Sequence, residues 1–487
     1  MKIQKNLILN VLGIMMVLTG VTMVGGLLSA LLLREFSMAV VFLATMIPMV
    51  LVGFLLYRIT KRKNQVLKMR DGLVATTLCW VFAIALAAMP FMFSGAFTSY
   101  IDAVFEAATS ITTTGATLIA DTATVPKSLM FWKAFLNWFG GIGILLLAIS
   151  ILPAMGVGAA NLVSAETSGN SLSNIRNRMR DIAKRIFLIY LILTVTEYLL
   201  LIFSELGIYD SLILTFQSVG NGEQIHTGGG MMGYGNIYVE VVVALFCILS
   251  ALSFINYPLL FKKRFREFFS EPEFRMFITV LAVLIVVVST GLIAAHTYGS
   301  PGEALRQGAL GSIAFTTTAG FQTEGFDEWP QFIQWLLLFA MAIGGCSAST
   351  SGGIKMVRLS VLFSVIKRNV YKRVHPNAVV SVKVGGRAIS DDKVSMIITF
   401  TLVYILITIF SCILLSLENY DMKSTVSTVI SMLSNTGTTI SNHPGIEYFS
   451  DFSPFSKLYM VILMITGRLE VMTVFLLFMP AFWRTSK

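Results

Sequence analysis

Long runs of apolar residues constrain the fold of this chain more than any other feature of its sequence. Each run is close to the roughly 20 residues that a helix needs to cross a lipid bilayer. The chain has 487 residues, of which 55% are hydrophobic and only 13% are charged, whereas about a quarter of the residues in a soluble domain are charged. We therefore expect an all-α integral membrane protein. The runs cover residues 7–33, 38–56, 73–93, 186–203, 239–260 and 277–295.

The net charge of +10 is concentrated in a few short segments between these runs. Basic residues gather in the segments 61–70, 176–185, 262–266 and 355–373, and the alternate connections hold few of them. This alternation follows the positive-inside rule, which places basic segments in the cytoplasm. Membrane topology therefore explains the charge, and we expect no nucleic-acid partner.

Cysteine and histidine residues are scattered along the chain. They show no spacing typical of a disulfide framework or a metal site. The sequence also lacks a recognisable Ser/His/Asp, Cys/His or paired-carboxylate arrangement, so we expect neither enzyme activity nor an organic cofactor. The residues concerned are Cys79, Cys247, Cys346, Cys412, His226, His296, His375 and His443.

Four short runs rich in Thr, Ser, Gly and Asn recur at comparable intervals. Each follows a short helix-like stretch and precedes an apolar block, which indicates an internal repeat. In the second run, Gly220 is an alternative to the glycine chosen as equivalent to the others. The runs occupy residues 112–117, 218–223, 316–321 and 434–439, with Gly115, Gly222, Gly320 and Gly437 as equivalent glycines.

Each run lies in a unit that consists of an outer helix, a short pore helix, a loop and an inner helix. We expect four helix–pore loop–helix repeats after an N-terminal extension of two transmembrane helices. The extension covers residues 1–60 and the repeats cover 72–160, 180–262, 273–370 and 391–484. The expected pore helices are 101–112, 208–219, 303–316 and 422–434, and the expected inner helices are 131–153, 237–261, 330–366 and 457–482.

Loops of this composition that dip into a bilayer suit the coordination of a cation. Backbone carbonyl groups can replace the water shell of a dehydrated ion, glycine permits strained dihedral angles, and the C-terminal end of each short helix favours positive charge. Ordinary polar surface loops are the alternative interpretation. The expected ligands are Thr113, Thr114, Gly115, Asn221, Gly222, Thr318, Ala319, Gly320, Asn435, Thr436 and Gly437.

The inner helix of the third repeat is interrupted by ten small or polar residues. Irregular backbone at membrane depth is tolerated only where protein or a water-filled cavity surrounds it, so we expect this stretch to lie close to the permeation path. A passive kink between packed helices is the alternative. The stretch comprises Gly344, Gly345, Cys346, Ser347, Ala348, Ser349, Thr350, Ser351, Gly352 and Gly353.

A broken helix also occurs in secondary transporters, which have inverted repeats and work by alternating access. A proton- or sodium-coupled cation transporter is therefore the alternative function. The loop charges read in the same orientation in all four units, which favours a single pore over inverted repeats.

Several motifs resemble those of the Trk/Ktr/HKT superfamily of potassium transporters. The two additional N-terminal helices are similar to the TrkH branch rather than the KtrB branch, and the match covers nearly the whole chain. The motifs lie at residues 112–117, 318–321, 137–143, 151–153, 352–355, 467–470 and 480–484.

This resemblance implies potassium uptake through one pore per subunit, with the repeats in pseudo-fourfold arrangement. It also implies a homodimer in a bacterial inner membrane, filter loops on the outer face, and a cytosolic ring of nucleotide-binding regulatory subunits similar to TrkA. By the same resemblance, residues 344–353 are a gate and Arg468 faces the pore below the filter. A brace that pairs with Glu470 or caps carbonyl groups is the alternative role for Arg468.

Other charged residues have two possible roles each. Lys355 and Arg358 either anchor the second half of the broken helix or contact the regulatory ring, and the basic segments, with Arg176 and Arg178, bind the partner or anionic lipid or only set the topology. We expect Glu197 to be a buried brace rather than a relay group. Asp102 and Glu106, on the first pore helix, are candidate mouth charges that attract cations.

Overall fold

The computed structural model describes residues 5–60, 69–151, 172–222, 233–321, 326–378, 380–441, 449–469 and 471–483, and helices dominate all of these parts. Six helices in the described ranges are long and apolar enough to cross a membrane. Many apolar side chains on them are exposed to the surroundings, including Leu32, Ile59 and Leu406, as expected for a lipid-facing surface. The prediction of an all-α membrane protein is therefore confirmed. The six spans are Lys5–Leu32, Phe36–Thr60, Arg70–Phe93, Asp181–Ile202, Pro272–Ala294 and Asp391–Glu418.

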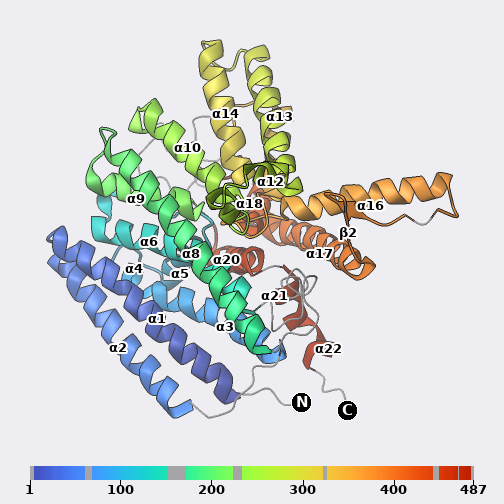
Figure 1. Cartoon of the computed structure of the whole chain (residues 1–487). Coiled ribbons are helices and arrows are strands. Elements are labelled where there is room, and N and C mark those ends of the chain that lie inside the picture. The colour runs from blue at the N-terminus through green and yellow to red at the C-terminus, as the bar shows by residue number, and fades with distance from the viewer. Residues whose placement is uncertain are drawn as a thin grey trace.

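The N-terminal extension is a pair of helices, α1 (Lys5–Leu32) and α2 (Phe36–Thr60), which pack along each other at one side of the molecule (Figure 1). Their backbones come close at Gly13 and Gly53, where a Cβ atom on either residue would meet the carbonyl oxygen of the other at 2.8 Å. Small residues at such a contact allow two membrane helices to approach closely.

The remaining helices follow the expected order of outer, pore and inner helix four times. The pore helices begin and end within two residues of the ranges expected from the sequence. The outer helices are α3 (Met69–Ala87, continued by α4, Met89–Phe93), α8 (Leu172–Ile202), α13 (Pro272–Ala294) and α17 (Asp391–Leu415). The pore helices are α5 (Tyr100–Ile111), α9 (Ile208–Gly220), α14 (Pro301–Thr317) and α18 (Met422–Ser434). The inner helices begin with α6 (Lys127–Ile151), α10 (Ile237–Ala251), α15 (Gln331–Ile343) and α20 (Pro454–Arg468).

Polar residues start most pore helices. Ser99, Ser300 and Asp421 precede α5, α14 and α18, and their side chains accept a hydrogen bond from a backbone N–H group in the first turn. Such caps satisfy donors that the helix itself leaves unpaired. The sequence thereby sets where each short helix begins, and so where its C-terminal end lies.

Pore and inner helices alternate around a closed ring. Each pore helix packs against the inner helix of its own repeat, in the pairs α5 with α6, α9 with α10, α14 with α15 and α18 with α20. Each also packs against the inner helix of the preceding repeat, in the pairs α6 with α9, α10 with α14, α15 with α18 and α20 with α5. The last pair joins the fourth repeat to the first and closes the ring.

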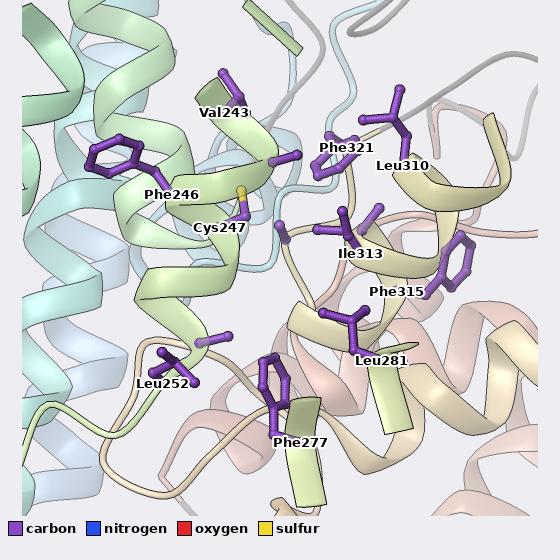
Figure 2. Packing of buried hydrophobic residues seen from close by; sticks show 14 of the residues in the cluster. Val243, Phe246, Cys247, Leu252, Phe277, Leu281, Leu310, Ile313, Phe315 and Phe321 are labelled. Atoms are coloured by element: carbon purple, nitrogen blue, oxygen red, sulfur yellow. The ribbon is translucent and has the colours of Figure 1, made fainter. Parts of the chain in front are cut away.

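Apolar contacts between repeats support this ring. Figure 2 shows side chains of α10, α13 and α14 meeting in one buried cluster, with Phe246, Phe277 and Phe315 among its largest members. The outer helix α13 and pore helix α14 also lie side by side in Figure 1. Burial of these side chains fixes the depth at which the pore helix ends.

Three of the four inner helices are broken, although only one break was expected. The range 237–261 stops as a helix at Ala251 and resumes as α11 (Tyr257–Phe261). Between them, the Phe254 N–H group donates to the Ala348 carbonyl oxygen at 3.0 Å, so contact with the interrupted third helix replaces a helical bond. The range 457–482 bends by 118° between α20 and α21 (Val471–Phe478). Arg468 is therefore the last residue of a helix, not an interior one.

Smaller elements complete the chain. Residues 344–355 are non-helical, and α16 (Met356–Val374) continues from them and extends away from the helical body together with a short hairpin (Figure 1). The hairpin, which the sequence did not predict, pairs β1 (Lys383–Val384) with β2 (Arg387–Ala388). The other short helices are η1 (Thr122–Thr124), α12 (Phe265–Ser270), η3 (Ser416–Glu418) and α22 (Pro480–Trp483).

Candidate cation filter and gate segment

Every pore helix ends in the same unusual backbone conformation. In each repeat, a residue that follows the last turn of the pore helix takes a left-handed conformation, which residues other than glycine rarely adopt. Because the four angles agree so closely, these residues define a common register for the repeats. They are Thr113 (φ 54°), Asn221 (φ 61°), Thr318 (φ 59°) and Asn435 (φ 54°).

A glycine with positive φ lies two residues further on in three of the repeats. These are Gly115, Gly320 and Gly437, with φ of 83°, 70° and 80°. By the same register Gly222 corresponds to the residue before each of these glycines, so the equivalence expected from the sequence shifts by one position. The position equivalent to Gly115 falls on Glu223, which lies outside the described residues, and Gly220 is the last residue of α9.

The four runs meet one another in a closed circuit. Asn435 Nδ2 donates to Thr114 Oγ1 at 3.0 Å, which joins the fourth run to the first. Thr438 Oγ1 donates to the Gly320 carbonyl oxygen, and Asn221 Nδ2 donates to the Thr317 carbonyl oxygen. The circuit closes between the first and second runs, where a Cβ atom on Gly222 would lie 2.5 Å from the Thr113 carbonyl oxygen.

Gly320 illustrates why the runs need glycine. Its backbone is left-handed, and a Cβ atom there would overlap the Thr436 carbonyl oxygen of the neighbouring run. Any larger residue would therefore strain its own backbone and displace the neighbouring run. Thr113, Thr318 and Asn435 are each at most 1% exposed, so the runs are not surface loops.

Side chains behind the runs hold them in place. Glu106 is completely buried in an ion pair with Lys133 of α6, so it is a structural anchor and not the mouth charge expected from the sequence. Glu197 accepts a hydrogen bond from Ser218 Oγ on α9, as expected for a brace. Gln334 of α15 donates to the backbone carbonyl groups of residues 326, 327 and 329.

Polar contacts also join pore helices to the inner helix of the preceding repeat. Asp102 pairs with Lys457 at 2.7 Å, which links the first repeat to the fourth. Arg306 pairs with the buried Glu240 through two hydrogen bonds, and this hydrogen bonding raises the pKa of Arg306, so the guanidinium stays charged. Tyr209 Oη donates to the Lys127 carbonyl oxygen at 2.6 Å.

Residues 344–353, here called the gate segment, pass directly beside three of the four runs. The Gly352 N–H group donates to Thr318 Oγ1 at 2.7 Å, and Asn221 Nδ2 donates to Ser351 Oγ at 3.3 Å. A Cβ atom on Gly352 would overlap the Ser434 carbonyl oxygen. The segment therefore lies against the ends of the pore helices in repeats 2, 3 and 4.

Three other contacts fasten the gate segment. The Cys346 N–H group donates to the Ala251 carbonyl oxygen at 2.9 Å, at the break after α10. The Glu273 carboxylate on α13 accepts bonds from the Ser347 N–H group at 2.6 Å, from Ser347 Oγ at 2.7 Å and from the Val357 N–H group at 3.2 Å. One carboxylate thus joins the gate segment to the first turn of α16.

Arg468 provides the third contact. Its Nη1 atom donates to the Thr350 carbonyl oxygen at 2.6 Å and its Nη2 atom lies 3.5 Å from the Gly140 carbonyl oxygen of α6. The side chain is 6% exposed. Arg468 therefore bridges the gate segment and the first inner helix; Glu470, its expected partner, lies outside the described residues.

The candidate partner-contact residues divide into two groups. Lys355 Nζ donates to the Ser351 carbonyl oxygen, and the Arg358 guanidinium carbon lies 3.8 Å from the centre of the Phe400 ring. Lys355 thus contacts the gate segment, and Arg358 contacts α17. Arg176 and Arg178 belong to the first turns of α8.

Comparison with known proteins decides the family. The family model of TrkH, described as a cation transport protein, matches residues 37–485. This chain belongs to the TrkH family. The resemblance inferred from the sequence motifs is therefore confirmed.

Relatives of the TrkH family match over nearly their whole length. The Trk system potassium uptake protein TrkH of Salmonella typhimurium strain LT2 is 33% identical over 485 residues, which cover 98% of this chain and 99% of that protein. The Trk system potassium uptake protein TrkG of Escherichia coli K12 is 29% identical, with 97% of each chain covered. The crystal structure of the potassium transporter TrkH from Vibrio parahaemolyticus has a TM-score of 0.90 and 31% identity, and the match covers 99% of this chain and 100% of that one.

The sequence analysis did not identify two anchoring residues, Lys133 and Glu273. Lys133 lies in an apolar stretch of α6, and an isolated charge within a membrane helix is a signal of function or of a buried partner. Glu273 follows Pro272 at the start of α13 and gives no such signal, because acidic residues are common in the first turn of any helix. Its role depends on the position of a segment that lies more than 70 residues away.

Proposed function

We propose that this protein takes up potassium ions through a single pore enclosed by the four filter runs. The observation that carries the proposal is the closed circuit of contacts among the runs at the ends of the four pore helices. Membership of the TrkH family, whose relatives are named as potassium uptake proteins, supports K⁺ as the transported ion. The ion moves inward down its electrochemical gradient.

The filter works through oxygen atoms that the backbone holds ready. Carbonyl oxygens of the residues on either side of Thr114, Ala319 and Thr436 face the path and replace the water shell of K⁺. The negative ends of four helix dipoles make a cation favourable at the same point without a fixed charge. In the second run Asn221 and Gly222 contribute in the register that the left-handed residues define.

The gate segment and Arg468 close the path next to the filter. A buried arginine beside a cation path opposes passage by charge repulsion, and its bond to Thr350 keeps the segment in place. A cavity of about 120 Å³, lined in part by Gly352, Tyr404 and Arg468, adjoins the segment. The segment opens the path by shifting into this space.

The protein acts in a bacterial inner membrane as a homodimer, with the filter runs on the outer face. The placement of basic segments supports this orientation. A cytosolic ring of nucleotide-binding subunits regulates the gate from the side of α16, which leads directly from the gate segment to the basic residues at its C-terminal end. The names of the relatives, which place them in a Trk system, support such a partner.

Uptake of ⁸⁶Rb⁺ into proteoliposomes tests the proposal. Purified wild-type protein should accumulate Rb⁺ when the liposomes contain K⁺, and excess external K⁺ should compete far better than Na⁺ or Li⁺. Adding a protonophore separates the two mechanisms: unchanged initial rates support a gated pore, whereas loss of uptake supports a proton-coupled transporter. Equal competition by K⁺, Na⁺ and Li⁺ would contradict the proposed filter.

A further inference from the structure

The pore loop of the first repeat contains a buried ion pair. Glu106 on α5 and Lys133 on α6 pair with each other, and neither side chain has any exposed surface. A buried charge pair is costly unless further hydrogen bonds satisfy both groups. The identity of those further partners therefore indicates what the pair does.

All of the further partners lie at the end of the filter run or directly after it. Thr117 Oγ1 donates to the Glu106 carboxylate at 2.8 Å, and the Leu118 N–H group donates to its other oxygen at 2.9 Å. Lys133 Nζ donates to Thr117 Oγ1 at 2.6 Å. The pair thus ties the pore helix and the inner helix to the backbone two and three residues after Gly115. Hydrogen bonds to charged groups are stronger than neutral ones, so this tie is stiff.

The carboxylate is particular to the first repeat, but the position that it anchors is not. In the fourth repeat, Ile440 lies five residues after its left-handed residue, as Leu118 does in the first. Ser427 Oγ accepts a bond from the Ile440 N–H group at 3.3 Å and donates to its carbonyl oxygen at 3.1 Å. A carboxylate in the first repeat and a hydroxyl group in the fourth repeat thus hold the same backbone position. The residues that correspond to Glu106 in the other pore helices are Leu214, Gly311 and Thr428.

We propose that Glu106 and Lys133 are positioning residues that set the cation selectivity of the first filter run. The inference rests on the proposed function, since it assumes that carbonyl oxygens of this run bind the ion. The pair is neutral overall, so it adds no net charge near the path. It fixes the place of the backbone, and with it the spacing of the carbonyl oxygens that distinguish K⁺ from the smaller Na⁺.

The test compares two double variants that each neutralise one buried pair. Glu106→Gln with Lys133→Met should fold and still take up Rb⁺, but its K⁺ over Na⁺ permeability ratio from reversal potentials should fall by about fivefold or more, the effect of losing one hydrogen bond. The matched control is Glu240→Gln with Arg306→Gln, because that pair also joins a pore helix to an inner helix, and the two carboxylates that pair with Arg306, Glu240 and Glu303, lie outside the four runs. The control should melt at a lower temperature with its permeability ratio unchanged.

Two further variants keep the inference testable if the first does not fold. Thr117→Val removes only the hydroxyl group shared by the pair and should also lower the permeability ratio. The charge exchange Glu106→Lys with Lys133→Glu keeps an ion pair but supplies no acceptor for Leu118, so it should not restore selectivity.

Two results would overturn the positioning role. One is a wild-type ratio in Thr117→Val, and the other is full rescue by the charge exchange. A wild-type protein without any K⁺ preference would instead contradict the proposed function itself, so the two failures are distinguishable.

Discussion

Repeats 1 and 3 contain the same succession of outer, pore and inner helix, yet their inner helices differ. In repeat 1, α6 runs from Lys127 to Ile151 without a break, and its Lys133 fastens the filter run. In repeat 3, α15 ends at Ile343, and the chain passes beside the filter before α16 begins at Met356. Under the proposed function, the two repeats are alike at the filter run that holds the ion and differ at the segment that controls passage.

This difference separates two tasks that a pore must combine. The filter runs are tied to neighbouring runs and to the helices behind them, so they keep their shape. The gate segment instead connects several repeats, since it is held by Glu273 of its own repeat, by Arg468 of the fourth repeat and by backbone groups of the second. A repeated architecture can thus acquire a gate by breaking one helix while leaving the filter symmetric.

Substitution of the filter glycines tests whether the filter runs of repeats 1 and 3 have the same role, and it should have the largest effect. Gly115→Ala and Gly320→Ala each force a side chain into a left-handed backbone, at a cost of roughly 1–2 kcal/mol, and at Gly320 the overlap with the Thr436 carbonyl oxygen adds roughly 1–3 kcal/mol. We expect both to lower the K⁺ over Na⁺ permeability ratio by at least about tenfold. Gly143→Ala is the control, because a Cβ atom there meets nothing within 4 Å. Opposite outcomes for the two filter variants would break the proposed symmetry.

Substitution of Arg468 tests the part of the comparison that concerns the gate segment. Arg468→Ala loses a charged hydrogen bond to the gate segment, which is worth roughly 1.5–3 kcal/mol, so resting Rb⁺ uptake should rise by about tenfold to a hundredfold. Arg468→Lys, which keeps the charge, should show a smaller increase. Unchanged uptake in the alanine variant would mean that the segment does not limit flux.

Neutralising the carboxylate at the gate should have a moderate effect. Glu273→Gln keeps an acceptor for Ser347 but loses the charge, and the loss of about 1 kcal/mol should raise resting uptake by about fivefold. Glu271→Gln is a suitable control, since Glu271 caps the same helix through the Phe274 N–H group. Equal behaviour of the two variants would show that only the helix cap matters.

The smallest effect is expected at the link between the first and fourth repeats. Asp102 is 24% exposed, although Lys457 is largely buried, and an ion pair that is open to solvent on one side contributes up to about 1 kcal/mol. Asp102→Asn should therefore lower the melting temperature by a few degrees and leave the permeability ratio unchanged. A changed permeability ratio would mean that Asp102 acts on the permeating ion and is not only a structural contact between repeats.

Sequence reasoning located the helices well because their boundaries depend on local signals. The range 422–434 matches α18 exactly, since Asp421 caps its start and a left-handed Asn435 follows its end. The apolar runs likewise identify the spans, because bilayer thickness sets their length. The stretch 344–353 could be predicted to be irregular for the same reason: small polar residues cannot form a lipid-facing helix.

Features that depend on the packed structure rather than on local signals were beyond the sequence. The register of the second run follows from the conformation of Asn221, which composition does not reveal. The break after Ala251 arises where Phe254 bonds to the gate segment, nearly 100 residues away. Glu106 was interpreted as a mouth charge because its partner, Lys133, approaches it only when α5 and α6 pack together.

Reversal potentials of the purified protein in planar bilayers test the central claim most directly. With K⁺ on one side and Rb⁺, Na⁺ or Li⁺ on the other, a filter of four backbone runs should pass K⁺ and Rb⁺ almost equally and exclude the two smaller ions. The Gly320→Ala variant should lose this discrimination while its fold is retained. Equal permeability to all four ions in the wild-type protein, or unaltered discrimination in the variant, would contradict the account.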